Sequence, residues 1–260
     1  MTGFHVTFLG TGTSVGVPMI GCGCETCCSE DPRDHRLRSS ILVKTPQLCL
    51  LVDSGPDLRQ QLLREQVTML DGVLITHPHA DHVMGFDDLR RFTPGKDDML
   101  PVFASSSCLD ALKKMFFYMF NNAKRYPGYF KPEPRDLEGK LSIGDLDISP
   151  IPVEHGNVEC MGFLFHYEGN PVFAYLPDCK RIPDASMKAL AGVGCLVIDA
   201  LRSRPHPTHM SIEEALAVAV ELDPAQTWLT HVSHEILHAR ERTALPDRVD
   251  FAYDGLQLRL

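Results

Sequence analysis

The sequence lacks the features that mark several large protein classes. No apolar run in its 260 residues reaches the roughly 20 residues needed to span a bilayer, and no secretory leader opens the chain. Internal repeats, low-complexity tracts and linker-like stretches are also missing. Basic residues are too few, 25 against 34 acidic ones, to favour a general nucleic-acid-binding surface. We therefore expect a cytoplasmic protein, folded as one domain over residues 1–260, that does not bind membranes.

Cysteine is abundant, with nine residues, yet its distribution does not suggest a disulfide framework. Four cysteines crowd into residues 22–28, and the other five are scattered at apolar positions. A dense group of this kind favours reduced thiols that bind a metal. The spacing Cys22-x-Cys24-x₂-Cys27 would supply three thiolates for a tetrahedral zinc site, which needs one more ligand. Cys28 is left over and competes with Cys27 for this role.

Short strand-like and helix-like segments follow one another along the chain. Strand-like runs occur at 4–9, 40–45, 48–53, 72–76, 100–104, 146–151, 162–167, 171–176, 195–199, 226–230 and 249–253. Helix-like segments occur at about 57–66, 83–91, 107–121, 184–191 and 211–222. Ser211 and Glu214 form a capping box at the start of the last helix. This mixture predicts a layered α/β domain, although the pattern alone does not set its topology.

The segment Thr-His-Pro-His-Ala-Asp-His, residues 76–82, follows an apolar run that predicts a buried strand. It places four possible metal ligands at one strand end: His77, His79, Asp81 and His82. Imidazole and carboxylate together suit Zn, Mn or Fe rather than Ca. Alternation along the chain sends His77 and His79 to one side. Asp81 and His82 can then reach a second position nearby, so the spacing suggests two metals.

Three more polar residues follow strand-like runs: His155, Asp178 and His231. Active sites of α/β proteins collect at such strand ends. Each residue alone is more often a satisfied end-of-strand group than a ligand. Together with residues 76–82, they predict a shared metal site.

The order of these motifs, His-x-His-x-Asp-His followed by a distant His, an Asp and a His, resembles the metallo-β-lactamase superfamily. The resemblance spans almost the whole chain. It implies an α/β fold, the four-layer αββα sandwich, with metals at one edge of the two sheets. Asp53 matches an aspartate that lies near the site in this family.

The resemblance also implies a role for each ligand. The first metal would be held by His77, His79 and His155. The second would be held by Asp81, His82 and His231, with Asp178 bridging the two. Two divalent ions, Mn or Zn, lying about 3.5–4 Å apart, can hold a bridging hydroxide and a substrate oxygen for in-line attack.

The cysteine cluster is similar to that of the phosphoribosyl cyclic phosphate phosphodiesterases of the carbon–phosphorus lyase pathway. In that family the fourth zinc ligand comes from a His-x-x-His pair, whose first histidine serves the active site. His231-Val-Ser-His234 matches this pair, so His234 would complete one structural Zn site. The same family has a catalytic histidine just before a late helix. In this chain that residue is His209, with His206 as a nearby competitor.

Two other motifs are not expected to form the active site. His234-Glu-Ile-Leu-His238 matches the HExxH metalloprotease pattern, but the segment is short and offers no further ligand set. Gly10-Thr-Gly-Thr-Ser-Val-Gly16 resembles a dinucleotide loop, but its spacing is wrong and no helix is expected after it. This glycine-rich segment would let backbone approach the site closely, or simply form a turn.

The expected substrate is a small phosphodiester, cyclic and ribose-based. Two divalent cations, less the charges of Asp81, Asp178 and a hydroxide, would leave roughly +1 in the site, which favours an anion. Lys and Arg side chains in residues 178–181 and 202–204 could add positive charge. His209 would act as the catalytic acid toward the leaving group.

Two other functions are kept as alternatives. A ribonuclease resembling the tRNA 3′-processing endonuclease is suggested by residues 113–131, which mix basic and aromatic side chains as single-strand binders do. The favoured interpretation of this insertion, at about 107–136, is a lid over the site or a face for a homodimer. The other alternative is a non-catalytic metal-binding scaffold, against which the complete ligand set argues.

Overall fold

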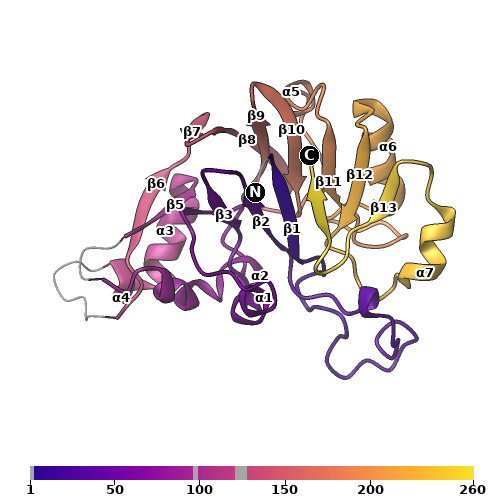
Figure 1. The fold of residues 1–260 in the computed structure, drawn as a ribbon. Coiled ribbons are helices and arrows are strands. Elements are labelled where there is room, and N and C mark those ends of the chain that lie inside the picture. The colour runs from indigo at the N-terminus through magenta and orange to yellow at the C-terminus, as the bar shows by residue number, and fades with distance from the viewer. Residues whose placement is uncertain (1–2, 96–98, 121–127) are drawn as a thin grey trace.

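Two sheets packed face to face form the centre of the molecule, and helices cover their outer sides (Figure 1). The computed structural model describes residues 3–95, 99–120 and 128–260, and within these ranges each sheet has seven strands. The four-layer αββα sandwich predicted from the motifs is confirmed.

The first sheet has the order β14-β1-β2-β3-β4-β5-β6. Its strands are β1 (His5–Gly10), β2 (Ser40–Lys44), β3 (Cys49–Val52), β4 (Gly72–Leu74), β5 (Leu100–Ala104), β6 (Pro132–Asp136) and β14 (Gln257–Arg259). Pairing is antiparallel from β14 to β3 and parallel from β3 to β6.

The second sheet has the order β13-β12-β11-β10-β9-β8-β7. Its strands are β7 (Leu141–Ile143), β8 (Leu146–His155), β9 (Val158–Tyr167), β10 (Asn170–Leu176), β11 (Cys195–Asp199), β12 (Gln226–Thr230) and β13 (Val249–Phe251). Pairing is antiparallel from β7 to β10 and parallel from β10 to β13. The carboxyl ends of β8, β10, β11 and β12 therefore lie at the same edge of this sheet.

Helices pack on the two outer faces. On the first sheet they are α1 (Leu58–Arg64), α2 (Ala80–Val83), α3 (Ser106–Met115) and α4 (Phe117–Phe120), with a 3₁₀ helix at Phe86–Phe92. On the second sheet they are α5 (Asp184–Ala189) and α6 (Ile212–Leu222), and the short α7 (His238–Glu241) lies beside them. None of the helices in the described ranges is long and apolar enough to cross a bilayer.

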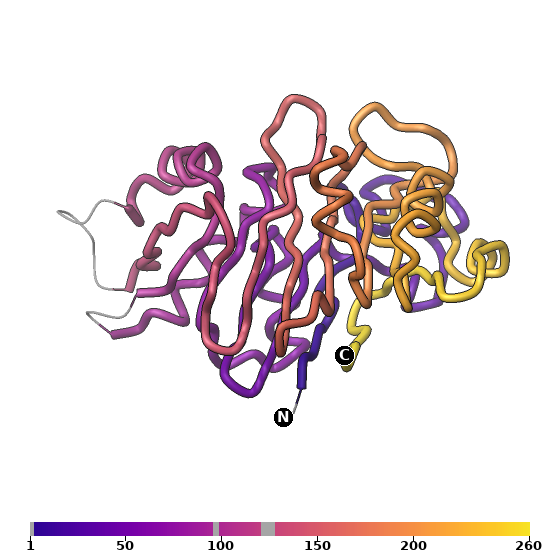
Figure 2. The backbone as a smooth tube through the Cα atoms, turned by 90° about the horizontal axis from the view of Figure 1, so that it is seen from above, coloured from indigo at the N-terminus to yellow at the C-terminus, as the bar shows by residue number. Residues whose placement is uncertain are grey.

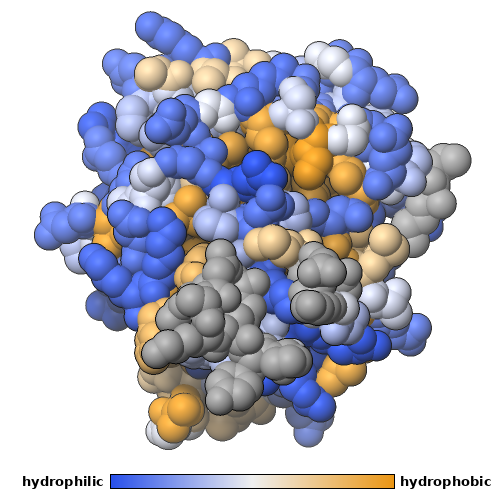
Figure 3. Space-filling view, turned by 90° about the vertical axis from the view of Figure 1, so that its left-hand side faces the viewer, coloured by the Kyte–Doolittle hydropathy of each residue, from blue (hydrophilic) through white to orange (hydrophobic). Residues whose placement is uncertain are grey.

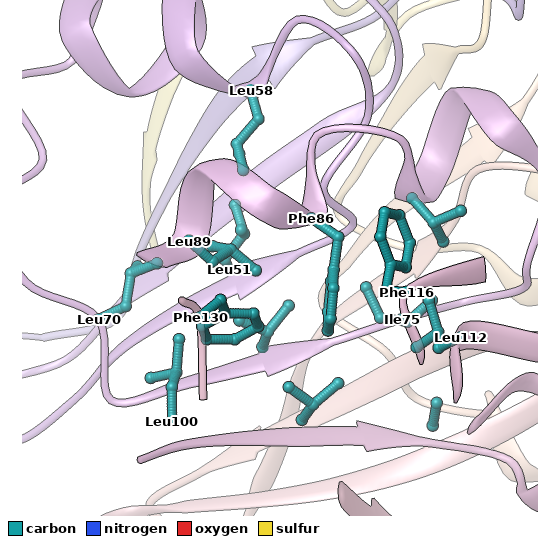
Figure 4. Close-up of a cluster of buried hydrophobic side chains, with 14 of the residues drawn as sticks. Leu51, Leu58, Leu70, Ile75, Phe86, Leu89, Leu100, Leu112, Phe116 and Phe130 are labelled. Carbon is teal, nitrogen blue, oxygen red and sulfur yellow. The ribbon is translucent and has the colours of Figure 1, made fainter. Parts of the chain in front are cut away.

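Three hydrophobic cores separate the four layers. Strand β3 shows why both faces of a sheet are buried: Leu51 points to the outer core against the helices, while Leu50 and Val52 point to the core between the sheets. Figure 4 shows the outer core of the first sheet, where Phe86 and Phe130 pack edge to face at 4.9 Å. Continuous apolar runs in the sequence are explained by this double burial.

The chain ends lie together, away from the carboxyl ends of β8 and β10. Strand β1 pairs with β14, and Leu260 N donates to Phe4 O at 2.9 Å. In Figure 2 the two ends are close to each other, and the tips of the 155–158 hairpin and the loop near 203–208 lie on the opposite side of the view. The site described below is built at the latter edge.

The predicted elements agree with the structure except at a few positions. The strands β6, β7 and β14 were not predicted, because β7 and β14 have three residues each and β6 contains two prolines and charged residues. The helix predicted at 83–91 is instead α2 followed by the 3₁₀ helix. The capping box of Ser211 and Glu214 at the start of α6 is confirmed.

The insertion predicted at about 107–136 contains residues 121–127, which lie outside the described ranges. Of its apolar side chains, Phe116, Met119 and Phe130 are buried in the outer core of the first sheet, and Phe117 is exposed. Figure 3 shows this end of the molecule, which is mainly hydrophilic around a hydrophobic patch. Its described aromatic residues therefore serve mostly as core, and a lid or dimer face stays a prediction.

Candidate metal centre

The motif at 76–82 leaves β4 and turns into α2, and this turn brings its side chains together. His77 is buried three residues after the end of β4, and His79 is the residue before the first turn of α2. Asp81 and His82 then lie inside that turn and are also buried. The segment after β4 and the single turn of α2 thus bring all four side chains together as one group of possible ligands.

The first cluster joins His77, His79 and His155, which comes from the last position of β8. His77 Nε2 and His79 Nδ1 are 2.9 Å apart, and His155 Nε2 is 3.3 Å from the same His79 atom. Burial holds the pKa of His77 well below its usual range, with the nearby His82 acting in the same direction. Neutral imidazoles that converge in this way have the lone pairs that a cation needs.

The second cluster joins Asp81, His82, Asp178 and His231. His82 Nε2 lies 3.3 Å from Asp81 Oδ2 and 3.2 Å from Asp178 Oδ1, and His231 Nδ1 lies 3.2 Å from that Asp178 oxygen. Burial alone would lower the pKa of His82, but Asp178 and the other carboxylates around it raise that pKa well above its usual value. The cluster therefore strongly favours positive charge.

Asp178 lies between the two clusters. Its Oδ1 faces His82 and His231, whereas its Oδ2 is 3.8 Å from His77 Nε2 and 3.7 Å from His155 Nε2. The carboxylate is almost fully buried. One oxygen toward each cluster is the arrangement expected of a bridging ligand.

Several buried atoms of this site lack a hydrogen-bond partner. Among the described residues they include His82 Nε2, Asp178 Oδ1 and His231 Nε2. Leaving buried polar atoms unpaired costs about 1–3 kcal/mol each, so such a concentration needs a compensating partner. Divalent cations fit, because imidazole nitrogens and carboxylate oxygens are their ligands.

Residues around the clusters hold the ligands in place. Asp53 accepts from Thr76 N at 2.8 Å, and its Oδ2 is 2.7 Å from His82 Nδ1. His155 Nδ1 is 2.9 Å from Thr208 O. These contacts fix ring orientation, as the outer partners of metal-binding histidines do. Asp53 and His231 both have a positive φ, 64° and 57°, a strained conformation that occurs at functional sites.

His209 faces the clusters from the loop before α6. Its ring centroid is 4.7 Å from that of His155 and 4.8 Å from that of His231. Its Nδ1 is 2.7 Å from Oδ2 of Asp199, which is buried at the end of β11. Burial alone would lower the pKa of His209, but the hydrogen bond to Asp199 raises it above the usual value.

Sequence reasoning missed Asp199, and it treated His206 as a competitor. Asp199 ends an apolar strand-like run in the same way as the predicted ligands, and that signal could have found it. His206 Nδ1 accepts from Thr208 N at 3.3 Å, and burial lowers the pKa of this histidine. His206 does not line the cavity at the clusters, whereas His209 does.

The cysteine loop forms a separate cluster with His234. Cys22 Sγ and Cys24 Sγ are each 3.3 Å from His234 Nδ1, and Cys27 Sγ completes a group whose ligand atoms lie within 4.8 Å of one another. The backbone N–H of Cys27 and the nearby His234 lower the pKa of Cys24 to about 6. Cys28 is exposed and outside this group, so it does not compete with Cys27.

The basic residues near the site are paired with acidic ones. Lys180 Nζ is 2.6 Å from Glu214, Arg181 pairs with Glu154, and Arg202 and Arg204 share Glu235. They do not line the cavity at the clusters, so a direct contact between them and a phosphate in this cavity is not supported, and solvated, paired surface is the better description.

The two rejected motifs have structural roles. His238 is buried, its Nδ1 accepts from Arg36 Nη2 at 3.1 Å, and it belongs to none of the ligand clusters found among the described residues. Gly12 lies against Arg36, whose carbonyl oxygen would be 2.7 Å from an added Cβ. The glycine-rich segment therefore lets two backbone segments approach each other closely at Arg36.

A family model described as the beta-lactamase superfamily domain matches residues 49–232. A crystal structure described as a new diphosphatase from the PhnP family is 37% identical, with a TM-score of 0.91, and the alignment covers 99% of this chain and 97% of that one. Zn²⁺-bound PqqB from Methylobacterium extorquens is 21% identical with a TM-score of 0.81, covering 98% of this chain and all of that one, and shows the same fold.

Curated relatives carry several different names. An octanoyltransferase of Porphyromonas gingivalis is 36% identical over 256 residues, which are 96% of this chain and 50% of that protein, so the chain spans half of its length. A ribonuclease Z of Clostridioides difficile is 25% identical, covering 80% of this chain and 68% of that protein.

Proposed function

Because this chain belongs to the β-lactamase superfamily of metal-dependent hydrolases, we propose that it hydrolyses a small, ribose-based cyclic phosphodiester at the cavity beside Asp178. The observation that carries the proposal is the position of Asp178 between two clusters of ligands, with His209 facing both. This geometry suits a reaction in which two divalent ions would activate an oxygen atom between them, while His209 donates a proton to the leaving group.

The chain's own residues fit two divalent ions. His77, His79 and His155 would hold one, Asp81, His82 and His231 the other, and Asp178 would contact both. Divalent ions bound there would polarise a phosphoryl oxygen and make a water molecule acidic enough to attack. The chemistry of the donor set suits Mn and Zn alike.

His209 supplies the proton in this proposal. Asp199 accepts from its Nδ1–H, which directs Nε2 toward the cavity and stabilises the protonated ring. A ribose alkoxide is a poor leaving group, so a proton delivered from Nε2 to the leaving oxygen lowers the barrier. His209 acts on substrate directly, while Asp199 acts by positioning His209.

The cysteine cluster has a structural role in this proposal. Cys22, Cys24, Cys27 and His234 would form a closed site for one Zn ion, which leaves no position for substrate. Since His234 is three residues after His231, such an ion would fasten the N-terminal loop to the edge that carries the active site.

A diphosphate is the second candidate substrate. It is favoured by the 37% identical structure, whose description names a diphosphatase. The same ligands would serve, but a phosphate leaving group needs less help from a proton donor than an alkoxide does. The ribonuclease alternative has weaker support, because the described aromatic residues of 113–131 mostly pack in the core.

A substrate panel tests the proposal. Purified, metal-loaded protein is offered a ribose cyclic phosphate, a 2′,3′-cyclic nucleotide, a nucleoside diphosphate ester, a tRNA precursor and an octanoyl thioester. We expect the highest kcat/KM on the ribose cyclic phosphate. A higher value on the diphosphate ester would select the second candidate, and cleavage of the tRNA precursor alone would select the ribonuclease.

Asp178→Ala checks that the activity comes from this site. The variant should lose at least about 10³-fold in kcat because the carboxylate that faces both clusters is removed. Asp184→Ala is the matched control, since Asp184 is exposed in the first turn of α5. Equal activity of the two variants would place the reaction elsewhere.

A further inference from the structure

The cavity beside the clusters has an outer wall that the reaction described above does not use. The cavity has a volume of about 370 Å³, close to the lower limit of small-molecule sites. Its inner part is formed by metal-site residues and His209. The outer wall is formed by Ser14, Gly156, Asn157, Val158 and Thr208.

The outer wall offers neutral hydrogen-bonding groups. No Lys or Arg is among the described residues that line the cavity. Arg38, behind Ser14, is held by Asp57 at 3.1 Å and donates to the carbonyl oxygen of Ser14. Whatever part of a substrate extends past the clusters is therefore not recognised by positive charge.

Asn157 lies two residues after His155. It lies in the two-residue turn that connects β8 and β9, whose register pairs His155 with Val158. Gly156, before it, has a φ of 56°, and a Cβ at this position would be 3.1 Å from Thr208 Cγ2. The turn thus packs against the loop that carries His209, and Asn157 is exposed at its tip.

Ser14 lies in the loop after β1 and is held by backbone contacts. Thr13 N donates to Val232 O, and Gly16 N donates to Thr13 O at 2.8 Å. The side chain of Ser14 is exposed at the cavity. Within the described ranges, neither its hydroxyl nor the amide of Asn157 is engaged by another residue.

We propose that Asn157 and Ser14 form a subsite for the hydroxyl-bearing, sugar-like part of the substrate, and that they determine specificity through KM. The inference rests on the proposed phosphodiesterase reaction. An amide and a hydroxyl each donate and accept, which matches a ring of neutral hydroxyls. An acyl chain would leave both groups unpaired, and a second phosphate or an RNA backbone would require cations.

The test compares two substrates that differ in hydroxyl groups. Asn157→Ala and Ser14→Ala are assayed on a ribose cyclic phosphate and on bis(p-nitrophenyl) phosphate. Each variant should raise KM for the ribose substrate by about 3- to 10-fold, with kcat within twofold, because one hydrogen bond contributes about 0.5–1.5 kcal/mol. KM for the nitrophenyl substrate should change less than twofold. Equal changes on both substrates would overturn the subsite.

Two controls separate this inference from the reaction itself. Asn170→Ala changes an exposed asparagine at the start of β10, outside the cavity lining, and should behave as wild type. Ribose 5-phosphate binding, measured by calorimetry with metal content checked, needs no turnover. Asn157→Ala should weaken it about 3- to 10-fold. Unchanged affinity would overturn the subsite, whereas absent phosphodiester hydrolysis with normal, Asn157-dependent binding would overturn only the proposed reaction.

Discussion

At the residue scale, His209 and Asp199 have different roles in proton donation: His209 would donate the proton, and Asp199 holds His209 in position. Asp199 is fully buried and holds Nδ1, while the ring of His209 faces the cavity. A proton donor matters only when the leaving oxygen is strongly basic. His209→Ala should therefore lose roughly 10²–10⁴ in kcat on an alkyl phosphodiester and under about tenfold on a nitrophenyl phosphodiester.

The same comparison distinguishes a proton donor from a phosphate-binding group. Steady-state kinetics on both substrates, with metal content measured, is the required experiment. Equal losses on the two substrates would remove His209 as the acid. His206→Ala is the matched control, since His206 is a nearby imidazole outside the cavity lining, and it should retain activity on both.

The lowered pKa of His238 predicts that the free energy of unfolding depends on pH. Burial, together with the charge of Arg36, lowers the pKa of His238 from 6.5 to about 4. Between these values the unfolded chain takes up a proton that the folded chain does not, so this residue makes stability fall as pH falls. His238→Gln keeps an acceptor for Arg36 and should reduce the stability lost between pH 6.5 and pH 4.5 by about 2 kcal/mol.

Denaturant unfolding at several pH values measures this effect. Loss of metal at low pH affects both proteins, so the difference between wild type and variant isolates His238. His35→Gln changes an exposed histidine and should keep the wild-type dependence. Parallel pH curves for wild type and His238→Gln would show that His238 is not the responsible group.

At the residue scale, the sequence predicted those side chains that form a motif or end an apolar run. His77 to His82 could be found because one strand end and one helical turn hold them all. Asp199 and Thr208 could not be assigned roles, because their contacts to His209 and His155 depend on how separate strands and loops are placed. The pairing of Arg181 with Glu154 was also invisible for this reason.

At the element scale, the loop at 21–28 contains no helix or strand, and a zinc ion bound by its cysteine cluster should hold it in place. His234→Ala removes one of four ligands, so the loop should lose its zinc. We expect a melting temperature lowered by several degrees, with activity per folded molecule largely retained. His35→Ala, in the segment after the loop, should keep both the zinc and the melting temperature.

Elemental analysis, calorimetry and an activity assay normalised to folded protein test this expectation. If His234→Ala and Asp178→Ala give the same profile, the division into a structural and a catalytic cluster is wrong.

The boundaries of helices and strands show a further limit of prediction from the sequence. Strand β6 joins the sheet through tertiary pairing with β5, although Pro132 and Pro134 weaken its strand pattern.

At the scale of the whole molecule, the three clusters predict a metal count and a pattern of thiol reactivity. We expect up to three metals per chain, of which mild chelation removes the active-site pair first, because the thiolate cluster is closed. Before stripping, one thiol of nine should react readily, since Cys28 is exposed and five cysteines outside the cluster are buried. After complete stripping, four should react.

Mass spectrometry of the alkylated protein, alongside elemental analysis, gives both numbers. Ready alkylation of Cys22, Cys24 and Cys27 in untreated protein, with no metal resisting chelation, would contradict the structural-zinc assignment. The αββα architecture was implied by the resemblance of the motifs to a known superfamily, whereas the strand order required the structure, because hydrophobic pattern does not say which strands become neighbours.

The pairing of β1 with β14 has a practical consequence. The two ends of the chain lie side by side, on the side of the molecule opposite the 155–158 hairpin, whose residues line the cavity (Figure 2). A resin, a sensor surface or a carrier protein can therefore be attached at either end, or at both, without standing in the substrate's path. When the protein is immobilised in this way, its cavity would remain open to the solvent.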